Sequence, residues 1–206
     1  MKPNGNLYLA LALLLSACQQ EQQYFLPGYD SIDLFIENGQ VVDGLGKAPF
    51  NADIAVVDDK IVFVGEAGFL TKDLSKRIRR HIDADGRIVA PGFIDLHSHG
   101  NPLETPAMEN FLAMGVTTVT LGQDGSSPNF NPLSIWLKNV STKGIGTNLV
   151  MFVGHGSLRN QSGIGMSDSP EPEQMDQMLH ILDQTLEYTF GLSTGLEYNP
   201  GLNAKL

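Results

Sequence analysis

Two histidines separated by a single residue, His97 and His99, are the strongest chemical signal in the sequence. They follow the apolar stretch Ile88–Leu96, which is typical of a buried strand. Because alternate side chains of a strand point to the same face, we expect both imidazoles on one side. Imidazole nitrogens placed in this way bind Zn²⁺ at about 2.0–2.1 Å. Asp95 shares this face and is expected to orient one imidazole. The alternative is an exposed pair of loop histidines.

The elements that would position these histidines alternate between strand and helix patterns after residue 87. Four apolar segments are typical of strands: Ile88–Leu96, Thr117–Leu121, Asn148–Val153 and Phe190–Glu197. Helix starts are expected at Thr105-Pro106, Asn131-Pro132 and Ser169-Pro170. Nearly continuous apolar strands that alternate with helices indicate a parallel sheet covered by helices. We therefore predict an α/β unit over residues 88–206 that forms the first half of a larger architecture.

The last of these helices carries an apolar stripe at helical spacing. Its members are Met175, Met178, Leu179, Leu182 and Leu186. We interpret the stripe as core packing rather than as a metal site. His180 on the same helix, and His81 earlier in the chain, are expected to lie outside any site.

Residues 31–87 contain short strand-like segments joined by turn residues. The segments are Asp33–Glu37, Gln40–Val42, Ile54–Val57 and Lys60–Val64. Asn38-Gly39 is expected to form a hairpin turn, because both residues tolerate positive φ. The basic run over residues 71–80 is interpreted as a solvated linker. We predict a small β domain that is incomplete as a closed sandwich.

The first 18 residues resemble the signal peptide of a bacterial lipoprotein. Their apolar core, Leu7–Leu15, has about nine residues and is too short to span a bilayer as a helix. The sequence from Leu15 to Cys18 resembles a lipobox, which implies lipidation of Cys18; the alternative is an ordinary export signal. Residues 19–30 would then form a tether. Because Gln19 follows the cysteine, the resemblance implies a lipid anchor at the periplasmic face of the outer membrane.

The composition of the chain excludes two classes of protein. Thirteen Lys and Arg residues stand against 23 Asp and Glu residues, a net charge of −10. Such a balance without a basic cluster argues against nucleic-acid binding, which requires clustered cations. A 42% hydrophobic content argues against a disordered acidic tail. Cys18 is the single cysteine, so no internal disulfide is possible.

Several longer motifs carry a resemblance to a known family. PGFIDLHSHG, which contains both histidines, resembles the first barrel strand of the amidohydrolase superfamily. NADIAVVDDKIVFVGE resembles the small urease-like β domain that precedes such barrels. GVTTVTLGQDGS, FVGHGSLR and GLSTGLEYNPG resemble the D-aminoacylase branch, the N-acyl-D-amino-acid deacylases. The resemblance covers about residues 31–204 and implies the first four units of a metal-dependent TIM (β/α)₈ barrel, truncated, behind a small β domain.

The resemblance also implies one or two divalent metals, with zinc expected. The family carries a cysteine ligand after its second strand, where this chain has Gly122-Gln123-Asp124-Gly125. Two metals close together need an anion between them. Glu197, at the end of the fourth predicted strand, is our first candidate for that bridging ligand, with Asp124 as a weaker substitute. An acidic residue that faces water is the alternative for Glu197.

Three further residues are candidates for substrate contact by the same resemblance. His155 follows the third strand, among loops where TIM-barrel active sites lie, and would contact substrate or polarise its carbonyl. Arg159 would pair with a substrate carboxylate. Tyr198 would form a wall of the pocket. A structural loop histidine and a surface arginine are the respective alternatives for the first two.

The implied reaction is hydrolysis of the amide bond of an N-acyl-D-amino acid, a small-molecule substrate, to a carboxylate and a free D-amino acid. The family's two further histidines and its base Asp, from later strands, have no counterpart in these 206 residues. We therefore expect this chain alone to be inactive and poorly soluble. Two other interpretations stay open: another amidohydrolase, such as an isoaspartyl dipeptidase or a cyclic amidase, and a non-catalytic surface lipoprotein.

Overall fold

The computed structural model describes residues 29–66 and 75–205. The chain divides into two compact units, with the boundary between Pro91 and Gly92. The predicted signal peptide, the lipidation site Cys18 and nearly all of the predicted tether lie outside the described residues. Among the described residues, no helix is long and apolar enough to cross a membrane.

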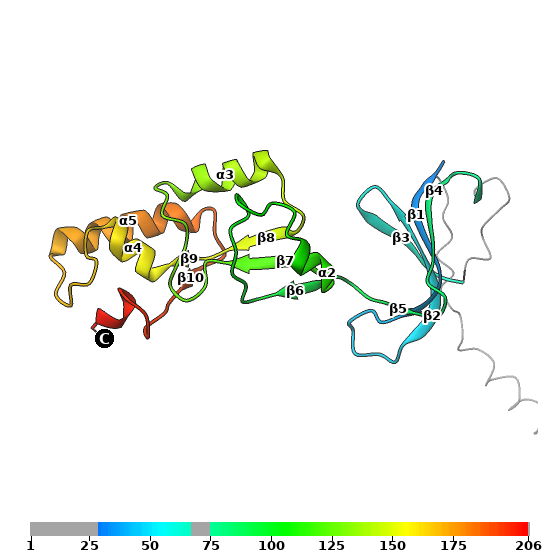
Figure 1. Ribbon diagram of the computed structural model, residues 1–206, viewed down its shortest axis with the longest axis horizontal. Helices are drawn as coiled ribbons and strands as arrows, with labels where there is room; N and C mark the ends of the chain where they lie inside the picture. The colour runs from blue at the N-terminus through cyan, green and yellow to red at the C-terminus, as the bar shows by residue number, and fades with distance from the viewer. Residues whose placement is uncertain (1–28, 67–74, 206) are drawn as a thin grey trace, which may run out of the picture. The chain divides into compact units, whose positions relative to one another are not determined.

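The first unit is a five-stranded sheet in the order β3-β2-β1-β4, with β5 also paired to β1 (Figure 1). Its strands are β1 (Ile32–Val41), β2 (Phe50–Val57), β3 (Lys60–Gly65), β4 (Ile78–Asp83) and β5 (Ile88–Val89). The pairs β1–β2 and β2–β3 are antiparallel, whereas β4 and β5 run parallel to β1. A buried cluster of Ile32, Phe35, Ala55 and Phe63 holds β1, β2 and β3 together.

One prediction for this unit was wrong, and a second was right only in part. Asn38 and Gly39 lie inside β1 rather than in a hairpin turn. Asn38 has φ 57°, and the pairing with β2 shifts register between Ile36 and Gly39, which defines a β-bulge. The tolerance of positive φ is therefore used for a bulge. The basic run over residues 71–80 lies partly outside the described residues. Its described part is exposed, as predicted, except for half-buried Ile78, but residues 78–80 belong to β4 through pairing with β1 rather than to a linker.

The second unit contains the parallel strands. A three-stranded sheet joins β6 (Phe93–Asp95), β7 (Val116–Leu121) and β8 (Asn148–Met151), all parallel. Next along the chain, β9 (Val153–Gly154) pairs in parallel with β10 (Leu192–Ser193). The helices are α2 (Glu109–Ala113), α3 (Leu133–Lys143), α4 (His155–Gln161) and α5 (Pro172–Leu186), followed by the 3₁₀ turn η1 (Gly201–Asn203). The predicted parallel α/β pattern is confirmed for these strands.

The largest buried cluster of the second unit joins its sheet to α2 and α3, and α3 lies alongside the sheet in Figure 1. Trp136 and Val140 of α3 are buried against Val119 and Met151 of the sheet. Burial on this scale stabilises by about 1.5–3 kcal/mol for each large apolar side chain. A second cluster joins β9 to α4 and α5 through Val153, Leu158 and Ile181.

Several predicted boundaries in the second unit were wrong. The expected strand Ile88–Leu96 is two strands, and its first part, β5, pairs with β1 of the first unit. The first helix begins at Glu109 rather than at Thr105-Pro106. Helix α5 begins after Glu171, whose side chain and that of Gln174 form a reciprocal capping box. Helix α4 was not predicted at all.

The apolar stripe of α5 is only partly in the core. Met178 and Leu182 pack against the buried cluster at Ile181, as expected. Leu179 and Leu186 are exposed in this structure. The stripe therefore marks the packed side of the helix but extends beyond it.

Candidate metal centre

His97 and His99 lie in the loop that follows β6. Ser98 between them is buried; its backbone N–H donates to the carbonyl of Thr120 at 3.1 Å. This bond ties the loop to neighbouring β7 and leaves the two histidines exposed on the opposite side. Their ring centroids are 5.3 Å apart. The alternation inferred from the spacing thus holds beyond the last residue of the strand.

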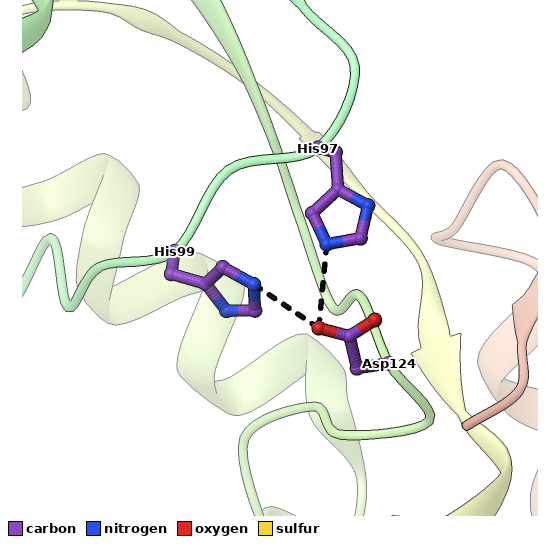
Figure 2. Close-up of side chains that lie close together, drawn as sticks. All are labelled: His97, His99 and Asp124. Atoms are coloured by element: carbon purple, nitrogen blue, oxygen red, sulfur yellow. Dashed lines mark hydrogen bonds and ion pairs between the residues drawn. The ribbon is translucent and has the colours of Figure 1, made fainter. Parts of the chain in front are cut away.

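Asp124 brings a carboxylate to the two imidazoles. It follows β7 in the left-handed region, with φ 56°, a conformation that aspartate tolerates. Its Oδ2 lies 3.3 Å from Nε2 of His97 and 3.2 Å from Nε2 of His99 (Figure 2). One ligand atom from each of the three residues falls within 4.8 Å of the others. A single carboxylate oxygen therefore faces both rings.

The chemistry of these three donors fits a divalent cation. Imidazole nitrogen and carboxylate oxygen are both ligands that zinc accepts. Asp124 is half-buried, while both histidines are exposed, so the three donors line a surface that a hydrated ion and a substrate can reach. Among the described residues, this is the group of histidine and acidic side chains whose spacing suits a metal ion.

Asp95 acts on His97 through the backbone. Its Oδ1 accepts a hydrogen bond from the backbone N–H of His97 at 3.1 Å. The sequence predicted that this carboxylate would orient an imidazole ring. Instead, the contact fixes the turn that follows β6, and thereby the direction from which the His97 side chain leaves the chain.

Glu197, the first candidate for the bridging ligand, is not brought to the two histidines. The predicted strand Phe190–Glu197 is reduced to β10, and Glu197 lies exposed in the turn that follows. Within the described part of the chain, the residue that joins His97 and His99 is Asp124, the substitute in the sequence analysis. A metal-binding role for Glu197 stays a prediction.

His155 is the first residue of α4 and is partly buried. Its Nδ1 is buried and has no hydrogen-bond partner among the described residues. Burial, with a smaller effect of the positive charge of Arg159, holds the pKa of His155 below its ordinary value. The ring is therefore neutral near pH 7. Its predicted contact with substrate stays a prediction.

Arg159 is bonded to the loop that follows α4. The side chain is buried, and Nε donates to the carbonyl of Gly165 at 3.0 Å. Its Nη2 donates to the carbonyl of Ser167. These two bonds hold the loop over residues 165–167 in place, and the predicted contact of Arg159 with a substrate carboxylate stays a prediction.

Two cavities adjoin the group formed by His97, His99 and Asp124. Asp124 and Tyr198 both line a cavity of about 360 Å³. His99 and Trp136 line a second cavity of about 410 Å³, and Ser126 lines both. Tyr198 is exposed at the first cavity, in the position expected for a pocket wall.

Comparison with known proteins identifies relatives that match most of this chain. No family model matches the sequence. N-acyl-D-glutamate deacylase of Alcaligenes xylosoxydans xylosoxydans is 31% identical over 195 residues, which cover 84% of this chain and 39% of the relative. D-aminoacylase of the same organism is 26% identical over 84% of this chain and 39% of its own length. The chain is a homologue of these amidohydrolases.

Solved structures of deacylases agree with this relationship. N-acyl-D-glutamate deacylase from Bordetella bronchiseptica, solved with zinc and a phosphonate inhibitor, superimposes with a TM-score of 0.77 at 30% identity. That match covers 85% of this chain and 40% of the other. A D-aminoacylase described as having a binuclear metal centre gives a TM-score of 0.75 at 27% identity, over 84% and 40% of the two chains. The chain thus spans about 40% of the length of its deacylase relatives.

Several residues that surround the Asp124 loop were not predicted from the sequence. Ser127, Ser157 and Ser193 each bond to this loop or to the strands beside it. Nothing in their local pattern distinguishes them from other serines of the chain. The signal available for Asp124 itself was its place directly after a strand that neighbours the strand before His97.

Proposed function

We propose that the protein to which this chain belongs is a metal-dependent amidohydrolase that cleaves the amide bond of N-acyl-D-amino acids. The observation that carries the proposal is the convergence of His97, His99 and Asp124 at the ends of two neighbouring parallel strands. The homology to N-acyl-D-glutamate deacylase and D-aminoacylase supports the substrate class. The activity of the whole protein is inferred from a chain that spans 39% of those relatives.

The three residues would hold the metal through two imidazole nitrogens and one carboxylate oxygen. A zinc ion in such a site polarises a carbonyl and lowers the pKa of water, which is the chemistry that amide hydrolysis needs. Asp95 keeps the turn before His97 fixed through its bond to the backbone N–H. The exposed Tyr198 would contact the substrate at the cavity beside Asp124, and the neutral His155 is a further candidate for substrate contact.

The test measures hydrolysis of D- and L-enantiomers by the full-length protein that contains this chain, with and without its metal. We expect hydrolysis of N-acetyl-D-glutamate or N-acetyl-D-leucine, little hydrolysis of the L-enantiomers, loss of activity after chelation and recovery with zinc. Asp124→Ala is expected to abolish the activity. Asp59→Ala, which changes an exposed aspartate in the first unit, is the matched control and should leave it intact. Equal turnover of both enantiomers, or activity that survives Asp124→Ala, would contradict the proposal.

We propose separately that residues 1–206 alone do not turn over substrate and associate in solution. Phe93 and Ile94 of β6 and the adjoining Leu96 are 63%, 62% and 74% exposed. Large exposed apolar side chains at the edge of a sheet favour association. The isolated chain should therefore elute as aggregates in size-exclusion chromatography and show no hydrolysis. A monomeric, active preparation would contradict this expectation.

Lipid anchoring at Cys18 is also a proposal, which rests on the N-terminal sequence alone. Radiolabelled palmitate should be incorporated into the protein in a bacterial host and lost in Cys18→Ser. Membrane fractionation should place the labelled protein with the outer membrane. Release of an unlabelled, soluble mature protein would indicate an ordinary export signal instead.

A further inference from the structure

One hydroxyl group from β10 bonds to the Asp124 loop on both sides of Asp124. The backbone N–H of Gly125 donates to Oγ of Ser193 at 3.2 Å. The same hydroxyl donates to the carbonyl of Gly122. These two peptide groups lie on either side of Gln123 and Asp124 in sequence. Ser193 therefore fixes the chain immediately before and after the carboxylate that faces the histidines.

Backbone contact from the next residues limits the position of Asp124 further. A Cβ added to Gly195 would lie 2.1 Å from the carbonyl oxygen of Asp124 and 3.0 Å from Cδ2 of Tyr198. Heavy atoms do not approach this closely, so any side chain at Gly195 would displace the Asp124 peptide. The glycine lets the two loops meet backbone to backbone.

The far side of the Asp124 loop is bonded to a different element. The backbone N–H of Ser127 donates to Oγ of Ser157 at 2.8 Å, and that hydroxyl donates to the carbonyl of Ser127 at 2.9 Å. Ser157 belongs to α4. Ser157 of α4 therefore fixes the loop at Ser127, whereas Ser193 of β10 fixes the part of the loop that contains Asp124.

We propose that Ser193, together with Gly195, is the positioning device that keeps the Asp124 carboxylate between His97 and His99. This inference rests on the proposed metal-binding role of Asp124. Ser193 touches neither the metal donors nor substrate, so it is a positioning residue. Asp124 has positive φ, and the peptide groups beside it must stay fixed for its carboxylate to face both rings. Residues that orient ligands in this way typically change metal affinity by about 10- to 100-fold.

The experiment measures Co²⁺ binding to the metal-free full-length protein by its visible absorption, together with the melting temperature of each variant before metal is added. Ser193→Ala is expected to lower Co²⁺ affinity by about 10-fold or more and to change the absorption spectrum. Ser193→Thr keeps the hydroxyl and should restore both. Thr194→Ala alters the exposed neighbour and serves as the matched control.

Two further variants distinguish an error in the proposed metal site from an error in the proposed role of Ser193. If Asp124→Ala leaves Co²⁺ binding unchanged, the proposed metal site itself is wrong. If Asp124→Ala abolishes binding but Ser193→Ala matches Thr194→Ala in affinity and spectrum, the positioning role is overturned. Should Ser193→Ala fail to fold, Gly195→Ala tests the same role, because it displaces the Asp124 peptide while all hydroxyl groups remain. Unchanged Co²⁺ affinity and spectrum in Gly195→Ala would then overturn the inference.

Discussion

Nε2 of His97 lies 3.3 Å from Oδ2 of Asp124, although 27 positions separate the two residues in sequence. The sheet brings them together: Asp95 of β6 is level with Val119 of β7, and both strands run in the same direction. The chain segments that leave the carboxyl ends of the two strands therefore emerge side by side. The parallel pairing of β6 and β7 therefore brings the three candidate ligands, His97, His99 and Asp124, close together.

The ligand role of Asp124 can be separated from that of Glu197 by two substitutions. Asp124→Ala should lower zinc affinity by more than the about 10- to 100-fold typical of residues that merely support ligands. Glu197→Ala should change it little, because Glu197 is exposed and outside the group of three. Isothermal titration of the metal-free full-length protein with Zn²⁺ measures both. The reverse ranking would restore Glu197 as the ligand.

Zinc binding should not depend on a thiolate from this chain. Its single cysteine is Cys18, whereas the donors at the site are nitrogen and oxygen. We therefore expect Cys18→Ser to bind zinc with the affinity of the unmodified protein, because imidazole and carboxylate ligands hold zinc without sulfur. Competition with a chromogenic chelator gives the two dissociation constants. A tenfold weaker Cys18→Ser protein would show that sulfur takes part.

Arg159 should affect stability and not metal binding. Its guanidinium supplies hydrogen bonds to the carbonyls of Gly165 and Ser167 from a buried position. Arg159→Met keeps much of the volume but removes these donors, and should lower the free energy of unfolding by about 1–3 kcal/mol. Urea unfolding measures this change. If Arg159→Met has the stability of the unmodified protein but a raised KM for substrate, the original substrate role is right.

His155 should make the metal-free protein less stable in mild acid. Its pKa is lowered in the folded state, so the unfolded chain binds a proton more readily. Stability is then fully present above the ordinary histidine pKa of about 6.5 and is lost as the pH falls through the lower, folded value. His155→Gln should reduce the drop in melting temperature between pH 7.5 and 5.5. The other histidines are common to both proteins, so identical drops would contradict this environment for His155.

Local sequence pattern predicted those elements whose own residues decide their structure. Strand β7 was predicted to within one residue because its apolar signal is continuous, and the start of helix α3 was predicted because a proline precedes a run of apolar residues at helical spacing. Asn38-Gly39 failed because positive φ serves a bulge as well as a turn, and the choice depends on the partner strand β2. The prediction of one continuous strand over Ile88–Leu96 was wrong because β5 pairs with β1, a segment that is distant in sequence.

In the candidate site, too, some features follow from local sequence and others depend on residues distant in sequence. The shared direction of His97 and His99 follows from spacing alone. The choice of Asp124 over Glu197 depends on which strands are neighbours and on the register between β6 and β7. The buried environment of Arg159 depends on how the loop through Gly165 folds back, which no local pattern encodes.

The most direct test is a crystal structure of the zinc-loaded full-length protein, with anomalous scattering data at the zinc absorption edge. We predict an anomalous peak within about 2.0–2.2 Å of a nitrogen of His97, a nitrogen of His99 and a carboxylate oxygen of Asp124. A zinc ion bound elsewhere, with Asp124 turned away from both histidines, would contradict the proposed metal centre.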